Sequence, residues 1–96
     1  MPTVVNMPAG TYFPRGEWRR NYGSIPPTFT TVTLQTDAGM DGVFWAIWDN
    51  AAAQDFDLLK NNGALITIPI PPGCTQANAQ LLVRNPCQSR FVLGAS

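Results

Sequence analysis

Prolines and glycines interrupt this 96-residue chain at short intervals from one end to the other. The chain has nine prolines and eight glycines, more than the usual combined share of about 12%. Proline inside a helix removes a backbone donor and clashes with the preceding turn, so the intervals are too short for long helices. Threonine, valine, isoleucine and aromatic residues fill them, which is the composition of strands. The sequence therefore predicts an all-β protein, a small sandwich or barrel of short antiparallel strands.

The first 27 residues are expected to be irregular. A proline fixes φ near about −65° and withholds a backbone donor, which leaves room only for short extended pieces. Four prolines act in this way here: Pro8, Pro14, Pro26 and Pro27. An extended arm laid across a neighbouring molecule is equally compatible with this composition. We therefore divide the chain into an irregular, proline-rich N-terminal arm, residues 1–27, and a single all-β domain, residues 28–96.

Two hairpins are expected in the domain. Residues 29–36 alternate apolar and polar side chains, and residues 37–42 are a turn rich in aspartate and glycine. The returning strand, residues 43–48, is apolar on both faces, which is typical of a central strand or an interface. A last hairpin joins residues 80–84 to residues 90–93.

Residues 50–60 fit either a helix or a strand. Asn50 could cap a short helix over the alanines that follow it. Alternatively, the second half of the segment is a strand, and the Asn62-Gly63 pair makes a two-residue hairpin turn into residues 64–68. We favour the hairpin, because apolar strand residues follow the Asn-Gly pair at once.

Nothing in the sequence predicts catalysis. The chain has no histidine, the usual general base and metal ligand. Aspartate is common in turns, where its side chain bonds the local backbone. Five aspartates lie in or beside the expected turns: Asp37, Asp41, Asp49, Asp55 and Asp57. Their spacing is not that of an EF-hand calcium loop. We expect a protein that is not an enzyme and holds no metal or cofactor.

Cys74 and Cys87 are expected to be free thiols. A strand is predicted between them, and at about 3.3 Å per residue its ends lie on the order of 20 Å apart. A disulfide needs Cα atoms within about 7 Å of each other. The pair therefore predicts neither a disulfide nor, in the absence of histidine, a zinc site.

Charged residues are scarce and unevenly distributed. They make up 12% of the chain and cancel to zero, whereas about 25% is usual. Since charge keeps small proteins soluble and monomeric, the surface is either neutral and polar or covered by other subunits. Residues 1–36 carry a net charge of +2, residues 37–59 carry −5 and the remainder carries +3. Segments of opposite sign on each copy favour contact between copies.

A polar and aromatic cluster predicts where such contacts form. Tryptophan and arginine are enriched at the desolvated centres of protein interfaces. Zero net charge without a basic face speaks against nucleic acid as a partner. The expected interface residues are Trp18, Arg19, Arg20, Tyr22, Trp45 and Trp48.

These features together indicate a protein that acts by association. We expect a small repeated component of a virion-like particle, such as a minor capsid, decoration or tail protein of a bacterial virus. Its partners would be other copies of itself, with a larger shell protein as a further candidate. Neither a secretory signal nor an apolar run of about 20 residues is present, so we expect no membrane contact. The expected location is the virion if the protein is viral, and otherwise the cytoplasm.

The alternative is a carbohydrate-binding module or adhesin. Exposed tryptophan flanked by aspartate and asparagine is typical of sugar recognition. The candidate sugar-binding residues are Trp45, Trp48, Asp49 and Asn50.

Overall fold

Buried and solvent-facing side chains alternate along most strands, and the buried sides share one core between two sheets. The computed structural model describes residues 2–96, apart from the side chains of Asn21 and Tyr22. The elements are β1 (Thr3–Phe13), β2 (Gly16–Ser24), β3 (Thr31–Thr36), β4 (Gly42–Trp48), β5 (Gln54–Asp57), α1 (Leu58–Asn61), β6 (Ile66–Pro69), β7 (Gln76–Val83) and β8 (Cys87–Ala95). Strand accounts for 60% of the chain and helix for 4%, which confirms the predicted all-β class.

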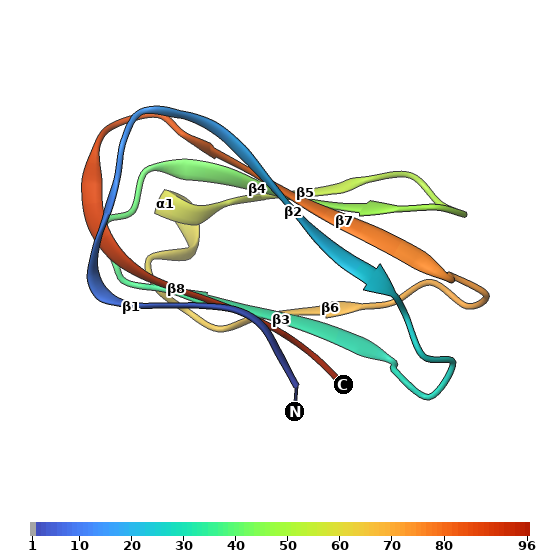
Figure 1. The fold of residues 1–96 in the computed structure, drawn as a ribbon. Coiled ribbons are helices and arrows are strands. Elements are labelled where there is room, and N and C mark those ends of the chain that lie inside the picture. The colour runs from blue at the N-terminus through green and yellow to red at the C-terminus, as the bar shows by residue number, and fades with distance from the viewer. Residues whose placement is uncertain (1) are drawn as a thin grey trace.

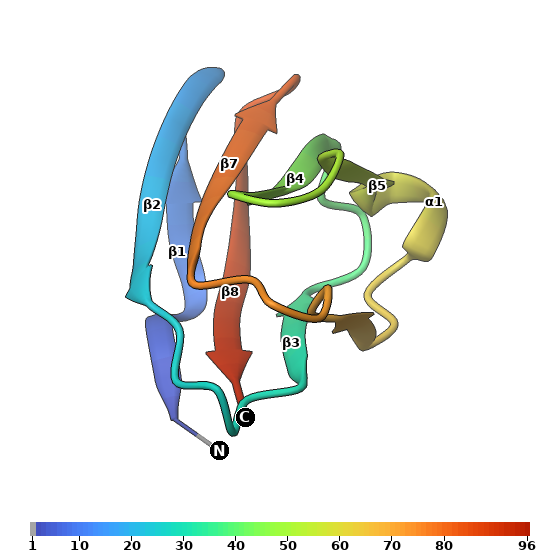
Figure 2. The ribbon, with the colours of Figure 1, turned by 90° about the vertical axis from the view of Figure 1, so that its right-hand side faces the viewer.

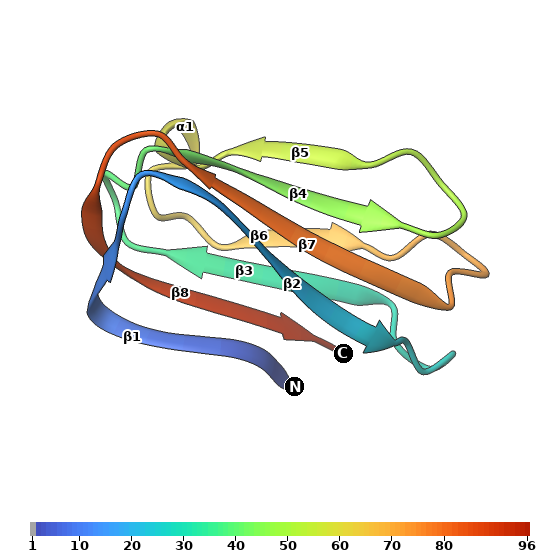
Figure 3. The same ribbon diagram turned by 45° about the horizontal axis from the view of Figure 1, so that its top comes forward.

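The eight strands form two antiparallel four-stranded sheets, which lie one above the other in Figure 1. One sheet has the order β1-β8-β3-β6 and the other β2-β7-β4-β5; the second is the upper layer in Figure 1 and the nearer layer in Figure 3. The chain crosses between sheets at every connection except the one from β4 to β5. This is the strand order of a jelly roll.

The predicted hairpins over residues 29–48 and 80–93 are wrong, although strands run through both segments. β3 pairs with β6 and β8, whereas β4 pairs with β5 and β7. β7 and β8 likewise belong to different sheets. Turn residues show that the chain reverses, but not whether the next strand joins the same sheet. Crossing lets both strands bury an apolar face in the shared core.

The expected hairpin turn at Asn62-Gly63 is also wrong. Asp57 caps the one-turn helix α1 by accepting a hydrogen bond from the Lys60 backbone N–H, and Asn62 ends the helix with φ 52° and ψ 46°. Gly63 also has a positive φ, 78°. Asn and Gly adopt a positive φ readily, which favours a tight hairpin turn. Here the same property lets the pair end a helix.

The irregular conformation expected for residues 1–27 is wrong for residues 3–24, most of which lie in β1 and β2. Both are edge strands, where proline removes no needed ladder donor. Pro8 lies in β1 at a shift of register between Met7 and Thr11, and Pro14 lies between the two strands. β1 and β2 run along the same side of the sandwich (Figure 2).

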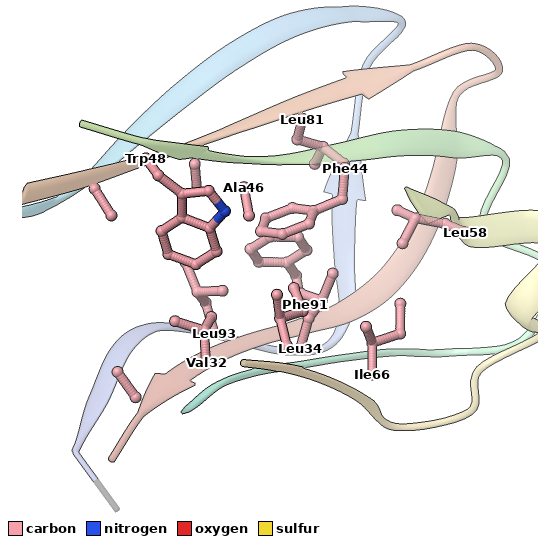
Figure 4. Packing of buried hydrophobic residues seen from close by; sticks show 14 of the residues in the cluster. Val32, Leu34, Phe44, Ala46, Trp48, Leu58, Ile66, Leu81, Phe91 and Leu93 are labelled. Atoms are coloured by element: carbon pink, nitrogen blue, oxygen red, sulfur yellow. The ribbon is translucent and has the colours of Figure 1, made fainter. Parts of the chain in front are cut away.

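Aromatic rings join the two sheets in the core. The ring of Phe91 on β8 lies 6.2 Å from that of Phe13 and 6.3 Å from that of Phe44, centroid to centroid. Trp18 on β2 meets Phe91 edge-on at 5.2 Å. Figure 4 shows Phe44 and Phe91 facing each other across the gap between the sheets. Such pairs contribute about 0.5–1.5 kcal/mol each beyond the area they bury.

Close approach of β4 and β7 predicts that Gly42→Ala destabilises the fold. A Cβ at Gly42 would lie 2.5 Å from the Leu82 carbonyl oxygen, a backbone atom that can move only if the sheet opens. We expect a loss of about 1–3 kcal/mol in the free energy of unfolding, measured by urea denaturation. Thr67→Ala, at an exposed position in β6, is the control and should change stability by less than about 0.5 kcal/mol. Equal stability of the two variants would contradict this packing.

Candidate interaction surface

The solvent side of the β2-β7-β4-β5 sheet carries a half-buried apolar centre. Phe44, Ala46 and Trp48 point into the core, so the intervening β4 residues point outward. We call this surface the Trp45 face; its residues are Val43, Trp45 and Ile47 of β4 with Gln80 and Leu82 of β7, all half-buried.

Two opposite charges lie at the ends of one row across this face. The register pairs Arg19 with Gln80, Gln80 with Trp45, and Trp45 with Asp55. Arg19 on β2 and Asp55 on β5 are exposed, and neither forms an ion pair with any residue that the structure describes. Three strand spacings separate them, about 14 Å. Each copy therefore presents a cation and an anion on either side of a tryptophan.

A shallow groove crosses part of the same surface. Its volume is about 480 Å³, and its lining is Arg19, Arg20, Ile47, Asn78, Ala79 and Gln80. Two amide groups and two arginines line it beside Ile47 and Ala79, so it can hold a side chain of a partner or a polar ligand.

The solvent side of the other sheet is different in kind. Thr31, Thr33 and Gln35 of β3 are half-buried, and Thr67 of β6 is exposed. These neutral polar groups explain how a chain with few charges can still face water. The outward side of β3 and β6 is thus neutral and polar, whereas the outward side of β4 and β7 has an apolar centre.

Four of the five aspartates are held within the subunit. Asp37 accepts a hydrogen bond from the Arg90 backbone N–H at 2.8 Å, which ties the β3–β4 corner to β8. Asp41 accepts from Arg84 Nε at 2.7 Å, and Asp57 accepts from Arg84 Nη2 at 3.3 Å. The expectation of local hydrogen bonds holds for Asp57 alone among these three, since it caps α1. The −5 segment is therefore mostly unavailable to the arginines of another copy.

Asp49 and Asn50 hold one end of the sandwich together. Asp49 accepts hydrogen bonds from the Thr75 hydroxyl at 2.6 Å and the Thr75 backbone N–H at 3.2 Å. These bonds, with that from the Thr75 side chain the strongest, lower the pKa of Asp49 from its ordinary 3.8 to about 2. Asn50 donates to the Pro72 carbonyl at 2.8 Å. Both side chains join the β4–β5 loop to the loop before β7.

The structure does not bring the four candidate sugar-binding residues together. Trp48 is 6% exposed and lies in the core among Val32, Leu93 and their neighbours (Figure 4). Its indole nitrogen finds no hydrogen-bond partner among the described residues. Trp45 points away on the opposite face of β4. Trp48 is therefore neither an interface residue nor half of a sugar platform, because strand alternation places residues three apart on opposite faces.

The predicted N-terminal interface cluster is also divided. Trp18 points inward and stacks on Phe13 at 6.1 Å between ring centroids. Arg20 covers the Trp18 ring at 4.5 Å, and Arg19 points to the other side, onto the Trp45 face. The side chain of Tyr22 lies outside the described residues.

Both cysteines are free thiols; Cys74 precedes β7 and Cys87 is the first residue of β8. Burial raises the pKa of Cys74, and the neighbouring Asp49 carboxylate raises it further. Burial also raises the pKa of Cys87, with a contribution from Asp41. Both groups therefore remain in the thiol form at neutral pH.

Sequence reasoning missed the contribution of β7 to the Trp45 face. Residues 77, 79, 81 and 83 are apolar and buried, and residues 76, 78 and 80 are polar. This two-residue period was visible in the sequence and assigns Gln80 to the outer side.

Comparisons with protein-family models, with curated proteins and with solved structures found no match. The one-turn α1 is the sole helix among the described residues, and no helix there is long and apolar enough to span a membrane.

The lowered pKa of Asp49 predicts a defined acid sensitivity. The ionised carboxylate stabilises the fold above about pH 3.8, and this contribution is lost as the pH falls towards about 2. Asp49→Asn should therefore be less stable than the parent protein in urea at pH 7, with the difference shrinking between pH 3.8 and 2. Asp55→Asn, which removes an exposed carboxylate without an ion pair among the described residues, is the control and should match the stability of the parent at pH 7. A constant difference for Asp49→Asn across this range would contradict the assignment.

Proposed function

We propose that this protein is a non-enzymatic assembly subunit, a small repeated component of a virion-like particle such as a minor capsid, decoration or tail protein of a bacterial virus. It acts through contacts with other copies of itself, made by the Trp45 face. The observation that carries the proposal is the row from Arg19 through Trp45 to Asp55. A half-buried tryptophan between two uncommitted, opposite charges is the composition of an interface centre with a charged rim.

The distribution of charge supports the proposal. Charged groups are scarce, and most of the aspartates are committed inside the subunit. Arg19 and Asp55 have no ion pair among the described residues, as is also true of Arg15, Glu17 and Lys60. Arg19 and Asp55 lie on the side of the sandwich that is also apolar. Solubility alone does not require the few free charges to lie beside an apolar face.

The jelly-roll strand order adds a weaker argument by analogy. Viral capsid domains and lectins both use this architecture, so the fold is compatible with the proposal and with the carbohydrate alternative. The choice between them depends on the surface residues.

The carbohydrate alternative now depends on Trp45 alone. The groove beside it carries amide groups of Asn78 and Gln80, which are suited to sugar hydroxyls. Titration of the protein with soluble oligosaccharides, followed by tryptophan fluorescence, distinguishes the two functions. A saturable change that Trp45→Thr abolishes would favour sugar binding over assembly.

Trp45 is expected to be the energetic centre of association. Trp45→Thr keeps a strand-forming residue while removing the indole, and should weaken association by about 2 kcal/mol, roughly thirtyfold in Kd. Sedimentation velocity over a concentration series measures the change. Tyr12→Thr is the matched control, because Tyr12 is an exposed aromatic residue on β1 of the other sheet. Equal effects of the two substitutions would contradict the assignment of this face.

The two neighbouring arginines are expected to differ. Arg20→Ala removes the cation over Trp18 and should lower the free energy of unfolding by about 0.5–1 kcal/mol. Arg19→Ala should leave stability unchanged and weaken association, because its side chain lies on the Trp45 face. Thermal unfolding and native mass spectrometry of both variants give the two readouts. An assembly defect confined to Arg20→Ala would overturn the proposal.

A further inference from the structure

We propose that the Trp45 face binds the Trp45 face of a second copy, about a two-fold axis parallel to the strands. This inference rests on the proposed function and specifies the partner and its orientation. It follows from the order of the strands, β2-β7-β4-β5, and from the opposite charges on the two edge strands.

The direction of the axis decides which charges meet. When one sheet is laid face to face on its copy about an axis parallel to the strands, the order of strands is reversed across the interface. β2 of each copy then lies over β5 of the other, and Arg19 faces Asp55 twice. A two-fold axis perpendicular to the strands and passing through the same row would lay β2 on β2 and β5 on β5, with Arg19 opposite Arg19 and Asp55 opposite Asp55. Like-charge contacts weaken association, so the parallel axis is favoured.

The adjacent row is compatible with this arrangement. It runs from Glu17 on β2 through Leu82 and Val43 to Asp57 on β5. Glu17 then faces Asp57 of the other copy, a carboxylate that shares Arg84 with Asp41 of its own subunit. Arg84 forms an ion pair with Asp57 at 3.3 Å, and the carboxylate also caps α1. The bound arginine reduces the repulsion that two bare acids would produce.

Side-chain size also fits the two-fold arrangement. Packed sheets lie about 10 Å apart, a distance that apolar side chains of both copies fill at the centre. At the rim, a long arginine and a short aspartate bridge the same separation. Trp45 of each copy comes opposite Gln80 on β7 of the other, with Leu82 in the adjacent row.

The size of the face indicates a weak contact. Four strands at about 4.8 Å and seven residues at about 3.4 Å give a projected area of roughly 450 Å² per copy. Stable pairs bury about 800 Å² per partner, so an isolated dimer is expected to dissociate in the micromolar to millimolar range. In a particle, many such contacts act together, and linked weak sites hold far more strongly than one.

Exchanging the rim charges tests the arrangement. Arg19→Glu opposes two acids at both rims of a homodimer, and Asp55→Arg opposes two bases. Each single variant should dimerise at least roughly tenfold more weakly than the parent protein. An equimolar mixture of the two should form a heterodimer with parental affinity, because both of its rim pairs are then opposite in sign. The double variant R19E/D55R should also regain the homodimer.

Native mass spectrometry resolves the heterodimer by mass, and sedimentation velocity gives the affinities. Arg15→Glu is the matched control, since Arg15 is exposed in the turn between β1 and β2 and outside the Trp45 face. It makes the same charge change and should leave dimerisation within about twofold of the parent. Thermal unfolding checks that the exposed substitutions leave the fold intact.

The possible failures separate this inference from the function on which it rests. Parent protein that stays monomeric up to millimolar concentration would overturn the proposed self-assembly. If the parent forms a dimer and neither Arg19→Glu nor Asp55→Arg weakens it, self-assembly stands and the two-fold arrangement is wrong. If the mixture forms open-ended oligomers and no discrete heterodimer, the contacts are head-to-tail and the two-fold arrangement is wrong.

Discussion

The contact of Phe91 with aromatic rings from three other strands is the interaction on which the rest of the sandwich depends. It links β8 of one sheet to β4 of the other and draws in β1 and β2 through Phe13 and Trp18. The N-terminal strands are held in the fold by this cluster. Because side chains alternate along a strand, fixing Trp18 and Phe44 inward turns Arg19 and Trp45 outward. The packing of the core thus arranges the surface that we propose for assembly.

Scarcity of charge has two consequences in this structure. Several of the few charged groups are used at the corners where the chain crosses between sheets, as in the contacts of Asp41 with Arg84 and of Asp37 with Arg90. These bonds stabilise crossings that have no backbone ladder of their own. The outward residues of β3 and β6 are neutral and polar, whereas those of β4 and β7 form an apolar centre. A sandwich with two unlike sides can associate through one while the other faces water.

Small jelly rolls have limited means of forming large contacts, because each sheet offers only a narrow face. The association that we propose for such subunits would therefore depend on many repeated contacts more than on the strength of any one contact. A weak, oriented contact also allows copies to dissociate and rebind until they are correctly placed. Complementary rim charges contribute to orientation more than to affinity, which suits Arg19 and Asp55 at the edges of an apolar centre.

Sequence alone determined the all-β class, because proline and glycine spacing excludes long helices whatever the tertiary structure. It also placed β3 and β4 nearly to their ends and identified Trp45 and Arg19 as candidate contact residues. Only the tertiary structure decided which strands pair, since a turn such as residues 37–41 reverses the chain equally well within a sheet or between two sheets. It also separated Trp45 from Trp48 and Arg19 from Arg20. The reason is that a sandwich buries one side of each strand, and packing in the shared core decides which side is buried.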